Sequence, residues 1–432
     1  MLEVGNNILT PAEEQTHFSL WAILKSPLVI GAALNDETTS IGDVSLSILS
    51  SKDVISFNQD ALGVSANLRR RWSEEQYEVW SGPLANGRTV VALINWAAGS
   101  RELTLNLPDV GIQHAGTVKN IWAGQTIRTV KTSYTATVDA HGVMLLELED
   151  TTEAGLYPSN KFASSVGFVV FTAKWATFFV LTLYSNKVTF DSVYANTSSS
   201  NHTISIVFSR PASSSTSITV QSSTNPSKHT IHVPASSKSV STSISLTAGS
   251  SNKVVIDSSL AIHSIQIKSP LGTYYPSTEF TLTGSASLTQ CGDGFCQPVG
   301  AKIGFLDSTN TAKVTISATI PSSSGDATAS KYLELDYINN DIAFSSSWGW
   351  GSNSRNVTIS VNGGEPVRLE VPLSGRHSEL FGPGLGWWDT SSLGVLVGGW
   401  KDGDNEVVVA NVAGSDAFQT WGADFVGVRV YD

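Results

Sequence analysis

The sequence predicts a mainly β protein with a short α/β portion at its beginning. Helix periodicity is confined to the first 66 of the 432 residues. From about Arg69 onward, short runs of alternating apolar and polar residues are separated by turn residues. A chain of this length accommodates several domains. We expect an α/β segment over residues 1–66, an antiparallel β-domain over 67–150, a linker over 151–185, and two β-sandwich-like modules over 186–268 and 274–432.

The composition excludes several classes of protein. The chain has 26 Lys and Arg residues against 37 Asp and Glu residues, a net charge of −11, which makes it a poor electrostatic partner for nucleic acid. Its two cysteines cannot hold together a fold of this size, so stability must come from buried apolar surface. With 41% hydrophobic residues and 12 Trp, the chain is not disordered overall.

The α/β segment begins with a clear helix signal. Thr10-Pro11-Ala12-Glu13 is a capping box with Pro at the first helical position, and it predicts a helix to about Lys25. The apolar run Leu28-Val29-Ile30-Gly31 fits a fully buried parallel strand. Asp43 to Phe57 has helical spacing again. Helix, buried strand and helix in this order are typical of an α/β barrel or a doubly wound sheet.

The predicted β-domain has a strong hairpin signal. Asn86-Gly87 lies between two segments of alternating residues, which predicts a tight hairpin turn. Turn residues separate the strands that we expect after it, at Glu102–Leu107, Val118–Trp122, Thr126–Val130, Tyr134–Val138 and Val143–Glu149.

The two later modules share a short motif. Tyr157-Pro158-Ser159 and Tyr275-Pro276-Ser277 each precede a Phe three residues on, Phe162 and Phe280. The match is short, so it only hints that the two modules are related.

One apolar segment, residues 166–184, differs from its surroundings. Its sequence, VGFVVFTAKWATFFVLTLY, is long enough to span a bilayer, but Lys174 lies at its middle, where a charge is costly. Its Val, Phe, Thr, Trp and Tyr residues favour strands. A membrane helix, a pair of buried strands and a stretch foreign to the mature protein all stay open, and the composition argues against a membrane partner.

Three strings in the first 66 residues are long and specific. They are MLEVGN at 1–6, HFSLWAILKSPLVIG at 17–31 and KDVISFNQDALG at 52–63. They closely resemble the end of the catalytic barrel in family 27 glycoside hydrolases, the α-galactosidases (melibiases). Residues 67–150 resemble the C-terminal antiparallel β-domain of that family. The later region is similar, more loosely, to β-sandwich carbohydrate-binding modules found in some fungal members.

The resemblance implies a retaining glycosidase on a (β/α)8 barrel, acting without a cofactor or metal. One Asp attacks the anomeric carbon, and a second Asp protonates the leaving oxygen and then activates water, with the two carboxyls about 5–5.5 Å apart. In the family, both residues lie upstream of the MLEVGN string. We therefore expect this chain to hold only the truncated end of the barrel, to carry no catalytic residue, and to be inactive alone.

The acids that remain in the first 66 residues are weak substitutes. A carboxylate pair must be positioned by several barrel strands, so we interpret these acids as solvated loop groups and helix caps. Met1 matches a family residue that lines the galactose pocket, which would make it a substrate contact, but we favour a plain initiator Met. The acids are Glu3, Asp36, Asp43, Asp53 and Asp60.

The helices of this segment have faces that would cover a barrel. Without the barrel, Phe18, Trp21 and Ile23 are expected to lose much of their burial, at about 1.5–3 kcal/mol for each large side chain. The segment is then expected either to be sensitive to proteases or to pack against the 67–150 domain for its stability.

Two tryptophan clusters are candidate substrate-binding groups. Trp348 and Trp350 are two residues apart, which places them on one face of a strand. Trp387 and Trp388 directly precede an Asp. An aromatic face can stack on the C–H face of a sugar ring while a polar neighbour holds the hydroxyls. Burial in a sandwich core explains these residues equally well.

Other motifs carry less specific signals. Cys291 and Cys296 enclose two glycines and fit a tight disulfide loop, because no further Cys or His lies near enough in sequence for a metal site. The run Asp402 to Glu406 is oxygen-rich, but it fits a polar turn better than a calcium loop. Trp400 and Trp421, in strand-like runs, are interpreted as core residues.

Two groups of residues complete the candidates. Asn196, Asn201 and Asn356 begin Asn-X-Ser/Thr tripeptides, which are glycosylation acceptors in a secreted protein. The isolated histidines have no nucleophile at a recognised spacing and are interpreted as structural: His17, His141 and His377.

The sequence is therefore interpreted as a C-terminal piece of a secreted, fungal-type α-galactosidase. The parent reaction would be hydrolysis of terminal α-galactosyl residues in galacto-oligosaccharides and galactomannans, and a signal peptide is expected in the full-length protein. The expected partners are α-galactosides or a plant-type polysaccharide. The alternative is a non-catalytic secreted carbohydrate-binding protein that uses the C-terminal tryptophans.

Overall fold

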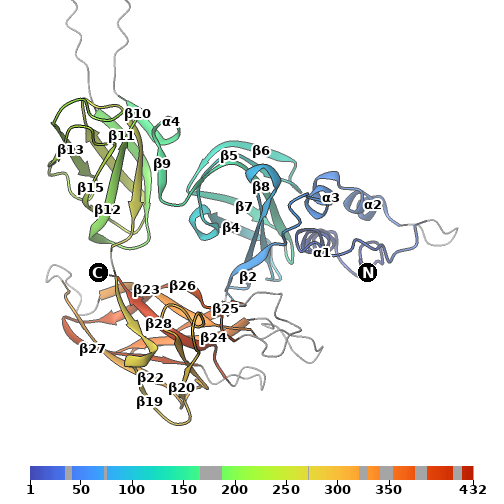
Figure 1. Ribbon diagram of the computed structural model, residues 1–432. Helices are drawn as coiled ribbons and strands as arrows, with labels where there is room; N and C mark the ends of the chain where they lie inside the picture. Colours follow the sequence, from blue (N-terminus) through green and yellow to red (C-terminus); the bar gives the residue numbers. More distant parts are fainter. Residues whose placement is uncertain are drawn as a thin grey trace, which may run out of the picture. The chain divides into compact units, whose positions relative to one another are not determined.

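The protein is mainly β, as the sequence predicts. Strands dominate, and they pair antiparallel within their sheets. Two compact units are present: residues 1–110, 114–151 and 272–430 form one, and residues 111–113, 152–271 and 431–432 form the other. The computed structural model (Figure 1) describes residues 1–34, 41–72, 75–165, 187–270, 272–320, 329–340, 354–374, 387–411 and 421–431.

The predicted first helix is confirmed with its cap. Helix α1 spans Pro11–Ile23, and Thr10 Oγ1 accepts a hydrogen bond from the Glu13 N–H at 3.3 Å. The Glu13 carboxylate in turn accepts from the Thr10 N–H at 2.8 Å. Both halves of a capping box are thus present, so the end of the helix has its backbone donors satisfied.

The helix expected from Asp43 to Phe57 is two helices. Helix α2 covers Asp43–Leu49 and helix α3 covers Lys52–Asn58. The break falls at Ser50 and Ser51, where the Ser50 hydroxyl donates to the Leu46 carbonyl at 2.8 Å and Ser51 adopts an extended conformation as the N-cap of α3. Serine side chains compete for backbone groups in this way, which the apolar periodicity does not reveal.

The expected parallel strand at 28–31 is reduced to a single bridge. Leu2 and Ile30 form an isolated parallel pair, and the Leu2 N–H donates to the Val29 carbonyl at 2.8 Å. Leu2 is fully buried, but Val29 is 50% exposed and Ile30 is 40% exposed. The prediction of a fully buried strand was therefore wrong in this structure, because no further strand among the described residues flanks the bridge.

The β-domain follows in the same unit. The hairpin predicted at Asn86-Gly87 is present: both residues have positive φ, 62° and 70°, in the short turn between β2 and β3. The strands of this domain are β1 Asn67–Trp72, β2 Tyr77–Leu84, β3 Arg88–Asn95, β4 Arg101–Asn106, β5 Ile112–Asn120, β6 Gln125–Lys131, β7 Ser133–Val138 and β8 Val143–Glu153.

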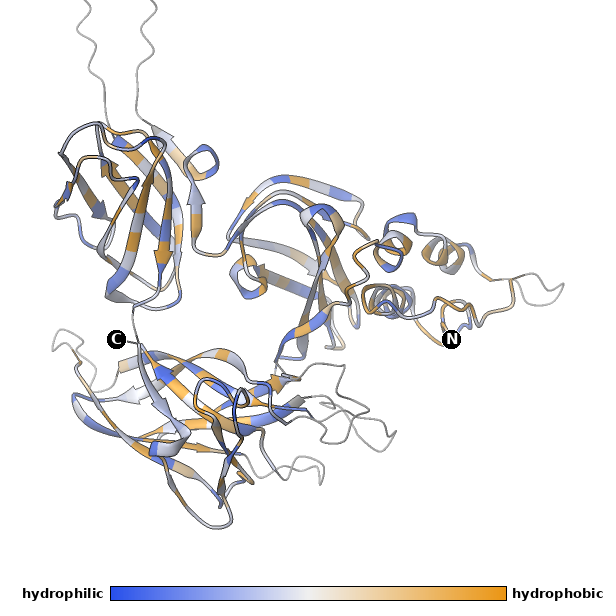
Figure 2. Ribbon diagram, in the orientation of Figure 1, coloured by the Kyte–Doolittle hydropathy of each residue, from blue (hydrophilic) through white to orange (hydrophobic). Residues whose placement is uncertain are grey.

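The helices pack on the β-domain and share a core with it. Phe18 and Ile23 are each 1% exposed and belong to one buried cluster with Ile94 and Leu145 of strands β3 and β8. The expectation that Phe18 and Ile23 lose burial was therefore wrong: a sheet of the β-domain covers this face of α1. Trp21 is only half-buried. Figure 2 shows the apolar residues on α1 and on the strands beside it.

The second unit is a β-sandwich with its own core. Its sheets have the strand orders β10-β11-β16-β13-β14 and β15-β12-β17-β9. The elements are β9 Leu156–Pro158, α4 Ser159–Phe162, β10 Ala163–Ser165, β11 Lys187–Ala195, β12 Ser199–Phe208, β13 Thr216–Ser222, β14 His229–Val233, β15 Ser239–Leu246, β16 Gly249–Asp257 and β17 Ile262–Lys268. The apolar segment 166–184 lies outside the described residues, and no helix within the described ranges is long and apolar enough to cross a membrane.

The C-terminal part of the chain is a further β-sandwich. Strands β19-β22-β27-β24-β25 follow one another in one sheet, and β20-β21-β28-β23-β26 form the other, with β18 beside β28. The strands are β18 Thr273–Pro276, β19 Thr281–Leu282, β20 Ser287–Gln290, β21 Ala301–Gly304, β22 Ala312–Ala318, β23 Ala329–Ile338, β24 Ser354–Val361, β25 Val367–Pro372, β26 Ser391–Trp400, β27 Gly403–Ala410 and β28 Asp424–Val430.

Candidate functional site

Within the described residues we consider three candidate places for function, and the first is the N-terminal edge. Met1 is 69% exposed next to the Leu2–Ile30 bridge. A set of large apolar side chains around this bridge and on the outer side of α2 is also exposed by 40–69%. We call this set the N-terminal apolar edge: Met1, Val29, Ile30, Leu34, Val44 and Leu46.

The acids of the N-terminal segment have structural partners. Asp43 and Asp53 lie in the first turns of α2 and α3, where a negative charge is favourable. Glu3 accepts a hydrogen bond from Asn6 at 2.8 Å. Asp60 accepts from the Arg88 guanidinium at 2.8 Å, and its environment holds the pKa of the carboxyl below its usual value. Burial alone would raise that pKa, but two backbone N–H groups and the nearby cations outweigh it. Asp36 lies outside the described residues.

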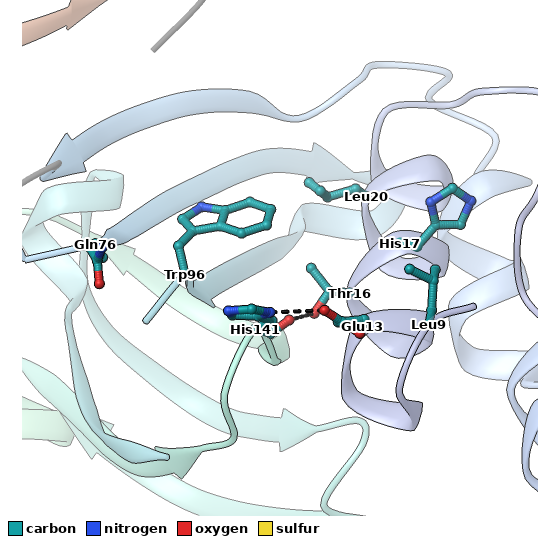
Figure 3. Close-up of a pocket in the computed structure, with 8 residues that line it drawn as sticks. All are labelled: Leu9, Glu13, Thr16, His17, Leu20, Gln76, Trp96 and His141. Carbon is teal, nitrogen blue, oxygen red and sulfur yellow. Dashed lines mark hydrogen bonds and ion pairs between the residues drawn. The ribbon is translucent and has the colours of Figure 1, made fainter. Parts of the chain in front are cut away.

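The second place is a cavity of about 520 Å³ between α1 and the β-domain. Figure 3 shows Trp96 and His141 of the β-domain facing α1. His141 Nδ1 lies 2.9 Å from the Glu13 carboxylate, and the Thr16 hydroxyl donates to the His141 carbonyl at 2.8 Å. The hydrogen bond from His141 is the largest cause that lowers the pKa of Glu13 to about 2. The lining residues are Leu9, Glu13, Thr16, His17, Leu20, Gln76, Trp96 and His141.

The third place lies on the C-terminal sandwich, at the predicted Trp387 and Trp388. Cys291 and Cys296 form the predicted disulfide, and the Cys296 N–H donates to the Trp388 carbonyl at 2.8 Å. The Lys302 ammonium lies 4.8 Å from the centre of the nearer Trp388 ring and 5.9 Å from that of Trp387. It also pairs with the Asp424 carboxylate, at 2.8 Å. The disulfide loop and a buried cation therefore fix both half-buried indoles.

A second cavity of about 520 Å³ opens beside Trp388. Asp336 is one of its lining residues, and the Asp336 carboxylate accepts from the Tyr274 hydroxyl at 2.8 Å and from the Ser392 hydroxyl. Burial and the neighbouring Asp336 raise the pKa of Tyr274. The residues that line this cavity, which we call the Trp388 cavity, are Gly294, Gln297, Pro298, Asp336, Ser374, Trp388, Asp389, Thr390 and Ser392.

Comparison with known proteins shows what the chain is similar to. Residues 74–148 match the family described as "Alpha galactosidase C-terminal beta sandwich domain". Over the whole chain, "Probable alpha-galactosidase D" of Aspergillus niger is 62% identical and the protein of the same name from Aspergillus terreus is 58% identical. The predicted resemblance to the α-galactosidases of glycoside hydrolase family 27 is confirmed. It spans 62% of the length of both relatives.

Solved structures of this family overlap a smaller part of the chain. α-Galactosidase I of Mortierella vinacea is 31% identical over 35% of this chain and 39% of its own, with a TM-score of 0.32. An α-galactosidase of Saccharomyces cerevisiae, solved with raffinose, is 27% identical over 35% of this chain and 46% of its own, also with a TM-score of 0.32.

The other tryptophans considered in the sequence have different environments. Trp348 and Trp350 lie outside the described residues. Trp400 is fully buried in the core of the C-terminal sandwich. Trp421 is 37% exposed, so its interpretation as core was wrong. It precedes β28 rather than lying in it, and its ring packs edge-on against the exposed Phe305 at 5.6 Å.

The three Asn-X-Ser/Thr tripeptides differ in accessibility. Asn201 is exposed on β12. Asn196 is half-buried, and its side-chain oxygen accepts from the Ser269 hydroxyl at 2.9 Å. Asn356 is 3% exposed in β24, and its side-chain oxygen accepts from Arg368 at 3.0 Å. A glycan on Asn356 would have to occupy the protein interior.

In the run from Asp402 to Glu406, only Asp402 precedes strand β27, and the residues from Gly403 on lie in that strand, so the prediction of a polar turn was wrong for them. The Asn405 side chain is fully buried and donates to the Lys401 and Gly403 carbonyls at 2.9 and 2.8 Å. Asp402 accepts from the Ile320 N–H at 3.1 Å. Sequence reasoning missed this role of Asn405, and it also missed the buried carboxylates of Glu14 and Asp336. The Glu14 and Asp336 carboxylates depend on partners distant in sequence, whereas Asn405 bonds carbonyls two and four residues before it.

Proposed function

We propose that this chain is part of an enzyme that hydrolyses terminal α-galactosyl residues. The support comes from the family match of residues 74–148 and from the 62% identity over the whole chain to a protein named as a probable α-galactosidase. The substrate class is galacto-oligosaccharides and galactomannans, and the mechanism is the retaining one that two carboxylates support.

The N-terminal apolar edge is the structural observation that supports the proposal most directly. A single parallel bridge, Leu2 with Ile30, has the pairing of a barrel sheet but only one partner for each strand among the described residues. Parallel sheets normally have both faces covered, and in a closed (β/α)8 barrel every strand has a neighbour on both sides. Val29 and Ile30 remain half-exposed. We propose that the catalytic barrel continues from this edge and covers it.

The chain's own acids have positions suited to holding this edge in place. Glu14 is 3% exposed, and its two carboxylate oxygens accept from the Gly5 N–H and the Ser45 hydroxyl, each at 2.7 Å. This carboxylate joins α1 to the N-terminal loop and to α2. In the proposed enzyme, it fixes the edge, while the catalytic carboxylates come from the rest of the barrel.

Hydrolysis of an aryl α-galactoside tests the proposal. The 432-residue chain should give no turnover above a buffer blank, whereas a polypeptide that also contains the barrel of the A. niger relative should release the aryl group. Loss of a nucleophile or of general acid catalysis each removes several orders of magnitude in rate. Turnover by the 432-residue chain, or none by the longer polypeptide, would contradict it.

A second candidate function is carbohydrate binding by the C-terminal sandwich. It is favoured by the half-buried Trp388 ring beside a cavity with Asp, Ser, Thr and Gln side chains. We propose that the chain is secreted, in line with its disulfide, which persists in oxidising compartments. A glycan-binding assay on the full chain tests this function independently of hydrolysis.

A further inference from the structure

The two sandwiches have one topology. In the first sandwich the two sheets have the strand orders β10-β11-β16-β13-β14 and β15-β12-β17-β9. We replace each strand by its counterpart in chain order in the second sandwich. The result is β19-β22-β27-β24-β25 and β26-β23-β28-β18, which are the orders that the second sandwich has. The counterparts run from β9 and β18, through β10 and β19 and then β11 and β22, to β17 and β28. Such agreement over nine strands indicates two copies of one fold.

The two copies also share their entry motif. Tyr157-Pro158-Ser159 leads from β9 into the short helix α4, and Tyr275-Pro276-Ser277 leads from β18 into the 3₁₀ turn Ser277–Glu279. Ser159 donates to the Ile262 carbonyl at 2.8 Å, and Ser277 donates to the Ala301 carbonyl at 3.2 Å. Each serine hydroxyl thus fastens the entry strand to its sandwich, Ser159 at β17 and Ser277 at β21, a strand without a counterpart in the first copy.

In both copies a buried asparagine near the start of the penultimate strand, Asn252 of β16 and Asn405 of β27, bonds the segment that leads into that strand. Asn252 donates to the carbonyls of Thr247 and Gly249, and its oxygen accepts from the Thr247 N–H. Asn405 makes the same three bonds with Lys401 and Gly403. The hint from the sequence that these modules are related is therefore supported by matching side-chain bonds.

The C-terminal copy contains an additional hairpin. Strands β20 and β21 lie in chain order between β19 and β22, and β21 joins the common sheet through Ile303 opposite Phe425 of β28. The Cys291–Cys296 disulfide closes the end of this hairpin. The end packs on the common fold, since both cysteines share a buried cluster with Ile338 and Val426.

The Trp388 cavity lies where the hairpin meets the common fold. Gly294, Gln297 and Pro298 come from the closed end of the hairpin, whereas Asp336 and Ser392 come from β23 and β26 of the common fold. The disulfide loop also contacts the aromatic wall: Phe295 stacks near the Trp388 ring at 5.6 Å, and the Cys296 N–H holds the Trp388 carbonyl. Removing the hairpin would remove one wall of the cavity.

The lining has the chemistry of a site for a neutral, hydroxyl-rich ligand. Trp388 offers one apolar ring, and the cavity is otherwise lined mainly by polar groups. Asp336 is 9% exposed and is already held by two hydroxyl donors, so it is fixed as an acceptor. The Thr390 hydroxyl is buried and has no hydrogen-bond partner among the described residues. The residues that line this cavity include neither Lys nor Arg, which disfavours an anionic ligand.

We propose that the disulfide-closed hairpin builds a site for one neutral pyranose unit in the Trp388 cavity. The ring stacks on Trp388 through its C–H face, and its hydroxyls bond Gln297, Thr390 and the acids beside them. This proposal rests on the second proposed function, carbohydrate binding, and specifies where on the chain the carbohydrate binds. Hydrolysis by the longer polypeptide does not depend on the site, so the two proposals fail in different assays.

Calorimetric titration of the 432-residue chain with raffinose and with galactomannan tests the site. Wild type should bind at least one of these probes, and maltotriose, which lacks galactose, serves for comparison. Trp388→Ala should weaken binding by about tenfold or more, because stacking supplies most of the apolar contact. Gln297→Ala changes an exposed side chain and should weaken binding with an unchanged melting temperature.

The matched control is Trp421→Ala, which removes an exposed indole of the same sandwich outside the cavity. It should bind as wild type does. Cys291→Ser with Cys296→Ser, which opens the hairpin, should lose about as much affinity as Trp388→Ala. No binding of either galactosyl probe by wild type would overturn the proposal. So would wild-type affinity in both Gln297→Ala and the double serine variant.

Discussion

The carboxylate of Glu14 accepts a hydrogen bond from the backbone N–H of Gly5 at 2.7 Å, across nine residues of chain. Its second oxygen accepts from the Ser45 hydroxyl of α2, also at 2.7 Å. A carboxylate that is 3% exposed and satisfied on both oxygens fixes three segments in one arrangement. The N-terminal edge is therefore a defined structure in this chain rather than a loose end.

Glu14→Ala should destabilise the chain by about 1–3 kcal/mol, because it leaves the Gly5 N–H and the Ser45 hydroxyl without their acceptor. Urea unfolding followed by Trp fluorescence measures the loss. Glu102→Ala changes an exposed carboxylate of the β-domain and should leave the midpoint unchanged. Equal midpoints for the two variants would show that the Glu14 bonds do not stabilise the fold.

The Glu13–His141 pair should make stability depend on pH in the acid range. The pKa of Glu13 is lowered from 4.5 to about 2, first by the hydrogen bond from His141 and then by the bonds from Thr10. A carboxyl with a depressed pKa contributes stability above its unfolded pKa, and the contribution is lost as pH falls from about 4.5 towards 2. Glu13→Gln should therefore flatten the loss of stability in this window.

Unfolding midpoints between pH 2 and pH 5 measure this effect. The matched control is Glu102→Gln, which should keep the slope of wild type. If Glu13→Gln and wild type lose stability with the same slope, the pair between α1 and the β-domain has no role in acid stability.

Arg88 should be necessary for the contact between the end of the helical segment and the β-domain. The Arg88 guanidinium pairs with the Asp60 carboxylate at 2.8 Å and also with the Glu147 carboxylate. The side chains of Asp60 and Glu147 are 2% and 5% exposed. Arg88→Ala leaves both carboxylates without this cation and should cost about 1.5–3 kcal/mol. Arg128→Ala, on the exposed side of β6, should change little. Comparable urea midpoints for the two variants would argue against this network.

Glycosylation should distinguish the exposed acceptor from the buried one. When the chain is secreted from a eukaryotic host, Asn201→Gln should lower its mass by one glycan, because Asn201 is exposed. Asn356→Gln should leave the glycan mass unchanged and reduce stability, because Asn356 bonds Arg368 in the interior. The intact mass of each variant, measured before and after glycosidase treatment, shows whether it has lost a glycan. A glycan on Asn356 would contradict the placement of this side chain.

Local signals in the sequence predicted the local structure well. The capping box at Thr10 and the turn at Asn86-Gly87 depend on residues close in the chain, and both are present. The disulfide between Cys291 and Cys296 spans only five residues and was also predicted. In each case, the residue types themselves fix the backbone conformation.

Features that depend on distant partners were not predictable from the sequence. The run at Leu28 to Gly31 has the composition of a buried strand, but its burial depends on neighbouring strands. Asp336 becomes a fixed acceptor only because Tyr274 lies 62 residues away in sequence but 2.8 Å away in space. The Trp388 cavity is likewise assembled from a hairpin and two later strands.

Amide hydrogen exchange at the N-terminal edge tests the central claim most directly. In the 432-residue chain, the amides of residues 28–34 should exchange rapidly, while those of β3 and β8 are protected. In a polypeptide that also contains the part of the A. niger relative outside the match, residues 28–34 should become as protected as β3, because the strands of the proposed barrel cover them. Equally rapid exchange of residues 28–34 in both polypeptides would contradict the claim that a catalytic barrel completes this edge.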